Sequence, residues 1–529
     1  MSLVSKKPPF SIVLLLLVHL LTSTNPDGAW TAQGATYYVA TAGRDSNPGS
    51  ATQPWQTIQK AANTLKAGDM VLIRSGTYHE RVLPANSGTD GQEIVYAAYP
   101  GETVTLDGSG VALPDDLVGL FEVLDRSHVR LSGLRIINAG IHNDNAGILV
   151  RNSHFISVQN NCTSNTFSSG IGVWDSDHVT VASNSVDLAC TGGWQEGISV
   201  AITDTFEVRN NQVAISQKEG ICIKQGSCNG TITLNRIERA KVGIYLDAWD
   251  RRTYNLEVGR NTVRDCQDDG IALSSEMGGL LENVFVHDNI AYHSGFIGLV
   301  ISTFGPGGPK GEHPMNGLSI LNNTIYNNGW EWGGGIAMDN PDALKVLIGN
   351  NLCSQNLSFQ ITVGSDVSLP SQQVTIDHNL IDGFRADPEG ETYGLAYVEG
   401  DPQFVNPAAE DFHLKPTSPA IDAGANQPAL LTVTDIDGQP RIFNGRVDIG
   451  ADEYVSQIGK FKLSPLLLPD GRFQLTISGE ARRAYSIEAS ANLMDWLKLT
   501  NLFSVTPAVV FVDEAASSFT WRFYRAVYP

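Results

Sequence analysis

Two carboxylates and one lysine stand at related points of a short recurring pattern in the chain. Lys224 ends the stretch GICIK, Asp247 ends GIYLD, and Glu276 lies six residues after the first glycine of GIALS. A pair of carboxyl groups cleaves glycosidic bonds when one donates a proton and the other acts as nucleophile or base. A lysine beside a sugar carboxylate suits a different reaction, because it can abstract a proton in β-elimination. The segment therefore favours chemistry on a glycan, with hydrolysis preferred over elimination.

The pattern that carries these residues repeats along much of the chain. Each repeat has a glycine followed by alternating apolar residues, and then an apolar-x-apolar-x-x-Asn sequence. The strands are too short for a sandwich and no helical segment separates them, which predicts coils of three short strands stacked on one another. The glycines are residues 147, 170, 197, 220, 243, 270, 298 and 335, and the asparagines are Asn161, Asn184, Asn211, Asn235, Asn261, Asn289, Asn323, Asn351 and Asn379. We predict an all-β chain, a right-handed parallel β-helix of about 9–12 coils whose asparagines form a ladder at one turn.

Stacked coils place equivalent residues directly above one another. Alternation within each strand turns the second and fourth residues after the glycine outward, so Lys224, Asp247 and Ser274 form one outward column. Glu276 lies in the next column, one coil from Asp247, at an expected Cα separation of about 8 Å. Carboxyl groups about 5–5.5 Å apart support retention and groups about 6.5–9.5 Å apart support inversion, so this estimate admits either outcome.

Aromatic residues gather around the same columns. A sugar ring stacks its C–H face on an aromatic ring while neighbouring polar groups bind its hydroxyls. Small residues between the columns leave room for such a ligand, and the insertion at 304–316 leaves the coils on the same side, where it can form a wall or lid. The substrate-binding residues that we predict are Trp174, Tyr245, Trp249, Arg251, Trp330, Trp332 and Asp339.

Two other functions fit the same residues. A lyase would use Lys224 as its base on a uronic-acid glycan and Ca²⁺ as its cofactor. Glu196, Glu219 and Asp269, each directly before a repeat glycine, are the candidate ligands. The dense aspartate clusters of Ca²⁺-dependent lyases are missing from the sequence, so we predict no cofactor and no metal site. A non-catalytic β-helix, such as an adhesin, would use the same face only to hold a glycan.

The repeat region is flanked by segments of different composition. Residues 1–34 have the pattern of a secretory signal, a basic start followed by an apolar run and small residues, which indicates bacterial-type export to the periplasm or the cell exterior. We expect the N-terminal cap and first coils at 35–110, the β-helix at 111–400, a closing segment at 401–455 and a small β-sandwich at 456–529. In the cap, a short helix should carry Trp55, Ile58, Ala62 and Leu65 on one face and cover the exposed strand edges.

The charge and composition of the chain limit the classes of molecule that it can bind. A net charge of −21 argues against nucleic acid, whose phosphates require a basic surface. No stretch after the leader reaches about 18 continuous apolar residues, so we expect no membrane span. We predict a monomer whose partner is a polysaccharide or an oligosaccharide. The six cysteines allow the pairs Cys162–Cys190 and Cys222–Cys228, and buried free thiols fit the spacing almost as well.

Parts of the sequence resemble known families. The stretch that begins YYVATAGRDSNPGS resembles the opening module of secreted right-handed β-helix proteins of the pectate-lyase type, and DIDGQPR with VDIGADEY resembles the segment that closes them. The stretch GIYLDAWDRRTYNLEVGRNTVRDCQDDGIALSSEM is similar to two catalytic coils of β-helical retaining β-xylosidases. These resemblances imply a carbohydrate-active β-helix, and the second implies Asp247 as nucleophile and Glu276 as acid/base.

Overall fold

The computed structural model describes residues 34–384, 390–443, 445–455 and, with short gaps, 462–527. The chain divides into a unit of coils, Trp30–Tyr454, and a C-terminal unit that begins at Val455. Nearly all of the predicted secretory signal, residues 1–33, lies outside the described residues.

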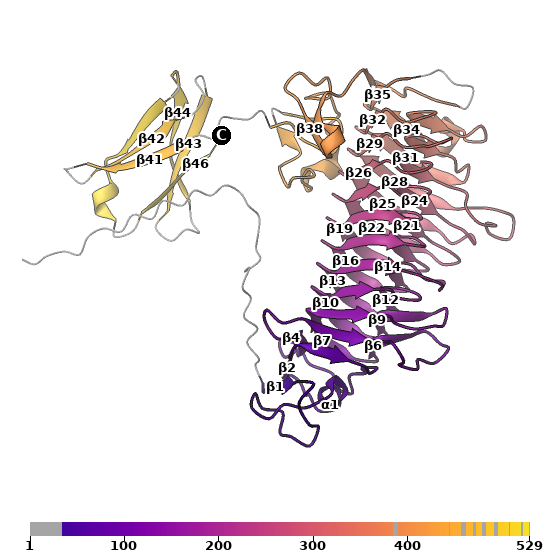
Figure 1. The fold of residues 1–529 in the computed structure, drawn as a ribbon. Helices are drawn as coiled ribbons and strands as arrows, with labels where there is room; N and C mark the ends of the chain where they lie inside the picture. Colours follow the sequence, from indigo (N-terminus) through magenta and orange to yellow (C-terminus); the bar gives the residue numbers. More distant parts are fainter. Residues whose placement is uncertain are drawn as a thin grey trace, which may run out of the picture. The chain divides into compact units, whose positions relative to one another are not determined.

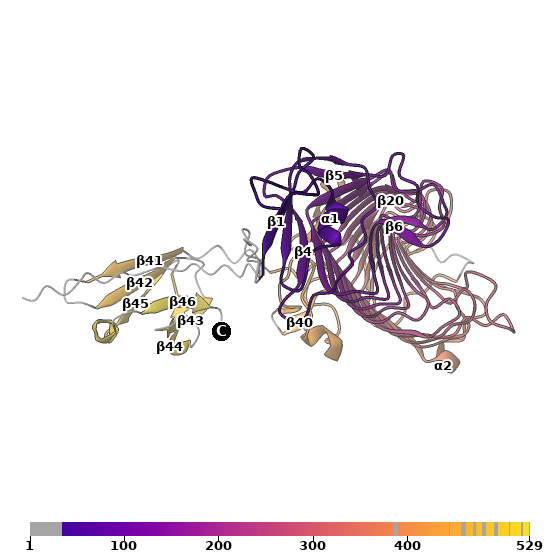
Figure 2. The same cartoon turned by 90° about the horizontal axis from the view of Figure 1, so that it is seen from below.

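The coil unit is a parallel β-helix built from three sheets (Figure 1). Every coil contributes one short strand to each sheet, and all neighbouring strands within the three sheets run parallel. Figure 2, turned by 90° from the first view, shows the strands of successive coils lying behind one another. The predicted fold class is confirmed.

The strand bounds follow the repeat seen in the sequence. Sheet I has 13 strands: β1 Thr36–Val39, β2 Met70–Ile73, β4 Ile94–Ala98, β7 Ser127–Ser132, β10 His154–Gln159, β13 Asp177–Ala182, β16 Asp204–Arg209, β19 Cys228–Thr233, β22 Thr253–Gly259, β25 Leu281–His287, β28 Met315–Leu321, β31 Ala343–Gly349 and β34 Val374–Asp377. Sheet II has 13 strands: β3 Gly76–Tyr78, β5 Val104–Asp107, β8 Leu134–Ile137, β11 Cys162–Ser164, β14 Ser185–Ala189, β17 Gln212–Ser216, β20 Arg236–Ala240, β23 Thr262–Arg264, β26 Ile290–Tyr292, β29 Thr324–Tyr326, β32 Leu352–Ser354, β35 Leu380–Asp382 and β36 Val398–Glu399. Sheet III has 10 strands: β6 Val118–Leu124, β9 Asn145–Arg151, β12 Ile171–Trp174, β15 Ile198–Ala201, β18 Ile221–Lys224, β21 Ile244–Asp247, β24 Ile271–Ser274, β27 Leu299–Ile301, β30 Ile336–Met338 and β33 Ile361–Val363.

The register of sheet III is the one that the repeat predicts. Lys224 of β18 pairs with Asp247 of β21, which pairs in turn with Ser274 of β24. Ile244 and Leu246 between these positions are fully buried in the interior core of the coils. Because side chains alternate along a strand, Asp247 therefore points outward, and the outward column of the sequence analysis is present in the fold.

The nine repeat asparagines form an unbroken ladder at the turn between sheets I and II. In each of the eight steps, from Asn161 to Asn379, the side-chain Oδ1 of one asparagine accepts hydrogen bonds from the backbone N–H and the Nδ2 of the asparagine one coil earlier. All nine side chains are buried. A buried amide costs free energy unless it is bonded, so the ladder ties the register of each coil to that of the next.

The N-terminal end of the β-helix is covered by a short helix, α1 (Ile58–Ala62). Thr57 caps the helix by accepting a hydrogen bond from the backbone N–H of Lys60 at 3.1 Å. Trp55 and Leu65 are buried in the same core but lie outside the helix, which is shorter than the predicted one. The apolar face was therefore predicted correctly, while half of its residues belong to the flanking loops.

Residues 401–454 pack along the outer side of sheet II in the later coils. Phe404 and Phe412 share an apolar cluster with Tyr292 and Leu352 of that sheet. The segment contains four short strands, two 3₁₀ turns and no longer element among its described residues: β37 Phe404–Asn406, β38 Asp411–Leu414, β39 Ile442–Phe443, β40 Arg446–Val447, η1 Pro407–Ala409 and η2 Pro428–Leu431. A second short helix, α2 (Leu369–Gln372), follows the last strand of sheet III.

The C-terminal unit consists of two small antiparallel sheets, as predicted. One sheet has the order β41-β42-β45 and the other the order β44-β43-β46. Phe473 of the first sheet stacks on Tyr524 of the second at 4.3 Å between ring centroids, so the two sheets share one core. Their strands are β41 Lys462–Leu467, β42 Phe473–Ser478, β43 Arg483–Ser490, β44 Leu497–Ser504, β45 Ala508–Asp513 and β46 Phe523–Val527, and a 3₁₀ turn, η3, spans Ala516–Ser518.

Neither of the two cysteine pairs that the sequence allows is bonded as a disulfide. All six cysteines lie within the continuously described part 34–384, and all six are free thiols. Cys190, Cys222, Cys228, Cys266 and Cys353 are buried, so they act as small apolar residues of the coils. The alternative of buried thiols is the correct one.

Among the described residues, no helix combines the length and the apolar character that crossing a bilayer requires.

The ladder makes a testable contribution to stability. Asn211→Ala removes three hydrogen bonds of 2.9–3.0 Å. The Asn211 Oδ1 no longer accepts from the backbone N–H and the Nδ2 of Asn184, and the Asn211 Nδ2 no longer donates to the Val181 carbonyl. We expect the free energy of unfolding to fall by about 2–4 kcal/mol, because buried polar groups lose their partners. Thermal and denaturant unfolding followed by circular dichroism measure the change. The control is Gln212→Ala at the next residue, whose side chain is exposed; equal losses for the two variants would contradict a special role for the ladder.

Candidate functional site

The outer face of sheet III forms the floor of a pocket of about 450 Å³. One wall comes from the loops that enter the strands of this sheet, and the other from the loops that leave them. The lining residues are Trp174, Trp194, Gln195, Glu196, Lys218, Glu219, Cys222, Lys224, Gln225, Tyr245, Asp247, Trp249 and Glu276. The three predicted catalytic residues therefore meet in one pocket.

Asp247 stands at the end of β21 and is held by the backbone. Its Oδ1 accepts hydrogen bonds from the backbone N–H of Trp249 at 2.8 Å and of Glu276 at 3.1 Å. The first bond closes a local turn of the kind that aspartate favours, and Trp249 takes a left-handed backbone conformation there. The second bond joins two coils, so Asp247 fixes the start of the loop that carries Glu276.

Asp247 is almost completely buried, with 3% of its surface exposed. Burial raises the pKa of its carboxyl to about 6, and the charge of Glu276 adds to this rise. The two backbone hydrogen bonds and the charge of Lys224 lower the pKa but do not cancel the effect of burial. This carboxyl therefore exchanges its proton close to neutral pH.

Glu276 contacts the phenol of Tyr245 through Oε1. Burial, together with the charges of Asp247 and Glu276, raises the pKa of Tyr245 far above its usual value. The phenol therefore stays protonated at any physiological pH, and it donates its hydrogen to the glutamate. Tyr245 was predicted to bind substrate directly, and it lines the pocket, but only 7% of its surface is exposed.

The insertion at 304–316 lies against the loop of Glu276, on the side that the sequence predicted. The backbone N–H of Gly307 donates to the Glu276 carbonyl at 2.8 Å. Gly305 has a φ of +81°, and a Cβ there would come within 2.6 Å of the Glu276 Cβ. Glycine is therefore needed for this close approach. Whether the insertion closes over a ligand stays a prediction.

Lys224 is engaged by the opposite wall. Its Nζ lies 2.6 Å from Glu196 Oε1 and 2.9 Å from Gln195 Oε1, and 5.4 Å from the centre of the Trp174 ring. Burial opposes the charge of the ammonium, but the charge and hydrogen bond of Glu196, together with the charges of Cys222 and Glu219, raise the pKa of Lys224 above its usual value. Lys224 is thus a protonated cation that already has its partners.

The three candidate Ca²⁺ ligands do not line one site. Glu196 and Glu219 lie in the pocket, and Glu196 also accepts a hydrogen bond from Ser199 Oγ at 2.6 Å. Burial and the charge of Glu196 raise the pKa of Glu219. Asp269 is outside the lining and accepts the backbone N–H of Ile297 at 3.0 Å, with a pKa raised by burial to about 7. A Ca²⁺ ion at Glu196 would have to compete with the ammonium of Lys224.

Four of the predicted substrate-binding residues lie outside the pocket lining. Arg251 is exposed, and its Nε lies 3.8 Å from Oδ1 of its neighbour Asp250. Trp330 and Trp332 are exposed in the loop before β30, three coils further along the sheet than β21. Asp339 is half-buried, and burial raises its pKa. Their role in binding stays a prediction.

Five residues of the lining were not among the predicted site residues: Trp194, Gln195, Lys218, Cys222 and Gln225. Trp194 and Gln195 directly precede Glu196, and Lys218 directly precedes Glu219, in the loops that enter sheet III. The repeat fixes the residues within strands, whereas these loops differ in length from coil to coil. The available signal is the position before each repeat glycine. Only the acidic residues at these positions were predicted as site residues from the sequence.

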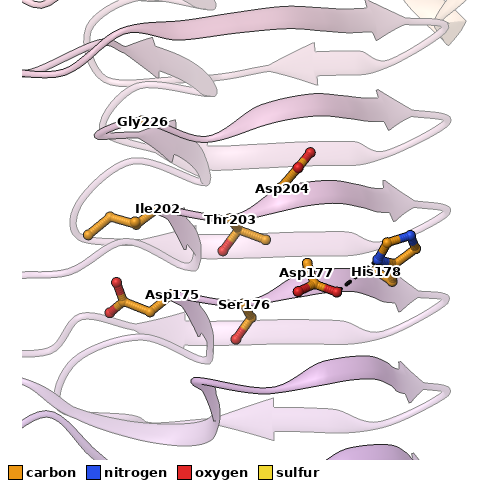
Figure 3. A pocket seen from close by; sticks show the side chains of 8 residues that line it. All are labelled: Asp175, Ser176, Asp177, His178, Ile202, Thr203, Asp204 and Gly226. Atoms are coloured by element: carbon orange, nitrogen blue, oxygen red, sulfur yellow. Dashed lines mark hydrogen bonds and ion pairs between the residues drawn. The ribbon is translucent and has the colours of Figure 1, made fainter.

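A second hollow, of about 440 Å³, lies where strands of sheet III turn into sheet I (Figure 3). Two of its carboxylates, one from each of two successive coils, are bonded to neighbouring side chains. Asp177 is bonded to His178, with 2.8 Å between Oδ1 and Nδ1, and also contacts His154, while Asp204 accepts from Asn229 Nδ2 at 2.7 Å. The hollow therefore offers turn-stabilising groups rather than a reactive pair.

One group of possible metal ligands occurs among the described residues, in the segment 401–455. The ligand atoms of His413, Asp437 and Asp452 lie within 4.8 Å of one another. His413 Nε2 is 2.7 Å from Asp437 Oδ2, and its pKa is raised to about 10 by hydrogen bonds to Asp437 and Asp411. The charged imidazole serves as the counter-ion of these aspartates.

Family models agree with the architecture. A model described as "Pel9A-like, right handed beta helix region" matches residues 37–195, one for the periplasmic copper-binding protein NosD matches 121–295, and one for a "right handed beta helix region" matches 251–400. Over its coils the chain is therefore similar to right-handed β-helix families, one of them of the Pel9A type, although each of these matches covers less than half of the chain. This confirms the resemblance seen in its opening segment.

Individual relatives extend the comparison. The uncharacterized protein YwoF of Bacillus subtilis is 25% identical over 466 residues, which cover 77% of this chain and 96% of the relative. Pectate lyase PEL9 of Emericella nidulans is 25% identical over 276 residues, which cover 50% of this chain and 58% of that enzyme. This chain thus matches less than two thirds of the fungal enzyme.

Two solved structures are similar in fold to this chain. Pectate lyase Pel9A shares 17% identity with a TM-score of 0.49, over 79% of this chain and 96% of its own. The complex of XylC with xylose shares 12% identity with a TM-score of 0.47, over 90% of this chain and 100% of its own.

Burial of Asp247 predicts that this residue destabilises the fold when it is ionised. Its folded pKa of about 6 lies above the ordinary value of 3.8. The stability that its protonated form contributes is present at low pH and is lost as the pH rises through about 6. Asp247→Asn keeps an oxygen that can accept from Trp249 and Glu276, so we expect the variant to be up to about 3 kcal/mol more stable than the native chain at pH 7.

Melting temperatures measured from pH 4 to pH 8 test this difference, which should grow as the pH rises. Asp175→Asn, at an exposed carboxylate outside the pocket, controls for the loss of one negative charge. A difference between native chain and Asp247→Asn that stays constant over this pH range would contradict the burial argument.

Proposed function

We propose that this protein hydrolyses glycosidic bonds and that Asp247 and Glu276 are its catalytic pair. The observation that supports the proposal is the meeting of the two carboxyls in one pocket, where burial raises the pKa of Asp247 to about 6. Glycoside hydrolysis needs one carboxyl that can hold a proton near neutral pH and a second that acts as base or nucleophile. The resemblance of two coils to retaining β-xylosidases adds to this, and retention is part of the proposal.

The electrostatics favour Asp247 as the proton donor. Its carboxyl is the buried one, whereas Glu276 accepts a hydrogen bond from the permanently protonated phenol of Tyr245. An acceptor role suits the ionised member of the pair. We therefore propose Asp247 as general acid and Glu276 as nucleophile, the reverse of the assignment that the xylosidase resemblance implies.

Three tryptophans around the pair supply surfaces for sugar rings. Trp174, Trp194 and Trp249 line the pocket from both walls, and Trp194 is the most exposed of them. An aromatic ring can stack on the apolar C–H face of a pyranose or furanose, while neighbouring carboxylates and amides bind its hydroxyls. The proposed ligand is accordingly a polysaccharide or oligosaccharide.

Elimination on a uronic-acid glycan is the second candidate. The sequence match to a fungal pectate lyase favours it. The state of Lys224 speaks against it, because a base must be deprotonated and this ammonium is stabilised by Glu196. A non-catalytic glycan-binding β-helix is the third candidate, and a carboxyl with a perturbed pKa inside a pocket favours an enzyme over it.

The setting that we propose is outside the cytoplasm. The N-terminal segment has the pattern of a secretory signal, and a periplasmic protein family and a pectate lyase are among the matches. We propose an exported monomer that needs no metal ion.

Substitution of the pair tests the reaction. The native chain is incubated with a panel of plant, algal and bacterial glycans, and both new reducing ends and the ultraviolet absorbance of unsaturated uronates are recorded. We expect reducing ends without unsaturated product, unchanged by a chelator, and a loss of at least about 100-fold in rate for Asp247→Asn and for Glu276→Gln. Asp175→Asn is the matched control. Full activity of either pair variant would remove that residue from the mechanism, and unsaturated product that vanishes with the chelator would establish the lyase.

The pH dependence tests the assignment of roles. If Asp247 donates the proton, kcat/KM on the cleaved oligosaccharide falls as the pH rises through about 6. If Asp247 is instead the nucleophile, kcat/KM rises through the same pH, since the ionised form is then the active one. We expect the fall, and proton NMR of the first sugar released should show the starting anomeric configuration.

A further inference from the structure

The charges of the pocket indicate which sugars it accepts. Resting on the proposed function, we infer that the substrate is an uncharged glycan, and that Glu196 excludes uronic acids by occupying Lys224. Glu196 is thus a specificity-determining residue rather than a catalytic one or a Ca²⁺ ligand.

The lining is acidic. Among its described residues, four carboxyls, those of Glu196, Glu219, Asp247 and Glu276, face two ammonium groups, those of Lys218 and Lys224. A uronate entering this pocket would bring a further negative charge into a partly dehydrated space. Such a charge is costly unless a cation accompanies it.

Lys224 cannot provide that cation while Glu196 is present. One carboxylate and one amide oxygen lie within 2.9 Å of its Nζ, and Trp174 covers a third side. Two of the three donors of the ammonium are bonded to these oxygens, and the Trp174 ring faces the cation at 5.4 Å. A substrate carboxylate would therefore have to displace Glu196 rather than bind beside it.

Glu196 is itself fixed in place. Only 6% of its surface is exposed, and Ser199 Oγ donates to its second oxygen at 2.6 Å. The pair of Glu196 and Lys224 is therefore held from both ends, and moving it would leave two buried charges without partners.

The second ammonium lies beside another acid. Lys218 directly precedes Glu219, and its charge lowers the pKa of that carboxyl against the effects of burial and of Glu196. A uronate at Lys218 would meet the charge of Glu219 as well. Neither lysine thus offers a site for an anionic sugar.

An uncharged sugar meets none of these penalties. Its hydroxyls can donate to the carboxylates and to Gln195, and its apolar face can stack on Trp194 or Trp249. The same groups that repel a uronate therefore favour a neutral ring.

Binding measured without turnover tests the inference separately from catalysis. Isothermal titration calorimetry is carried out on the full chain with Asp247→Asn, using neutral tetrasaccharides of xylose, glucose, mannose and galactose, with tetragalacturonate as the anionic probe. We expect at least one neutral probe to bind at least about tenfold more tightly than tetragalacturonate, a difference of 1.4 kcal/mol. Tighter binding of tetragalacturonate, or no binding of any neutral probe, would overturn the inference.

The role of Glu196 is tested by removing its charge. In the same background, Glu196→Gln should increase the affinity for tetragalacturonate by about tenfold, because Lys224 is then a buried cation that lacks an anion. Adding Lys224→Met should abolish the gain. Asp175→Asn, an equal loss of charge outside the pocket, should leave the affinity unchanged; a gain with Asp175→Asn, or none with correctly folded Glu196→Gln, would contradict the role of Glu196.

The two proposals can fail independently. Selective binding of a neutral probe by a chain that hydrolyses nothing would leave the pocket as a neutral-glycan receptor and refute the hydrolase. Hydrolysis of a uronate polymer that depends on Asp247 and Glu276 would keep the catalytic pair and refute the preference for an uncharged substrate.

Discussion

The in-register stacking of coils is the constraint on which every other feature of this protein depends. Parallel strands alone would allow each coil to slip by two residues while keeping its apolar side chains inside. The buried asparagines prevent such a slip, since each amide has one partner position in the next coil. If a single coil slipped along its neighbours by two residues, several buried donors would lose their acceptors, at a cost of about 1–3 kcal/mol each. The ladder thus converts a repetitive sheet into a scaffold with fixed positions.

Fixed positions are what allow charged groups to be placed one coil apart and still be buried. Lys224 and Asp247 are in register on neighbouring strands, and the backbone N–H of Glu276 reaches Asp247 from the following coil. The loops that enter and leave sheet III then rise on both sides and exclude water from the floor. The raised pKa of Asp247 follows from that enclosure, so the free energy that keeps this carboxyl buried is supplied by the stability of the coils beneath it.

The sequence could predict whatever the repeat controls. Glycine and asparagine spacing gave the coils, the outward column and the meeting of Asp247 with Glu276, because stacking is a local rule applied many times. The sequence could not place Trp330 and Trp332 in the pocket by outward phase alone: they precede the repeat glycine at 335, three coils beyond the one at 243, and three coils at about 4.8 Å each carry them about 14 Å from the level of Asp247. It also could not predict Trp194, since the loop lengths that set the walls do not follow the repeat.

Lys224 shows how far one unpredicted contact can change a chemical interpretation. From the sequence alone it is a lysine beside a carboxylate, which fits a base for elimination as well as a salt bridge. Glu196, one coil earlier and outside the strand pattern, stabilises the ammonium so strongly that proton abstraction becomes unfavourable. The same contact removes the cation that a uronate would need. One carboxylate thus argues at once against the elimination mechanism and against its substrate, and the two arguments are linked because a lyase of this type needs both the free base and the bound acid sugar.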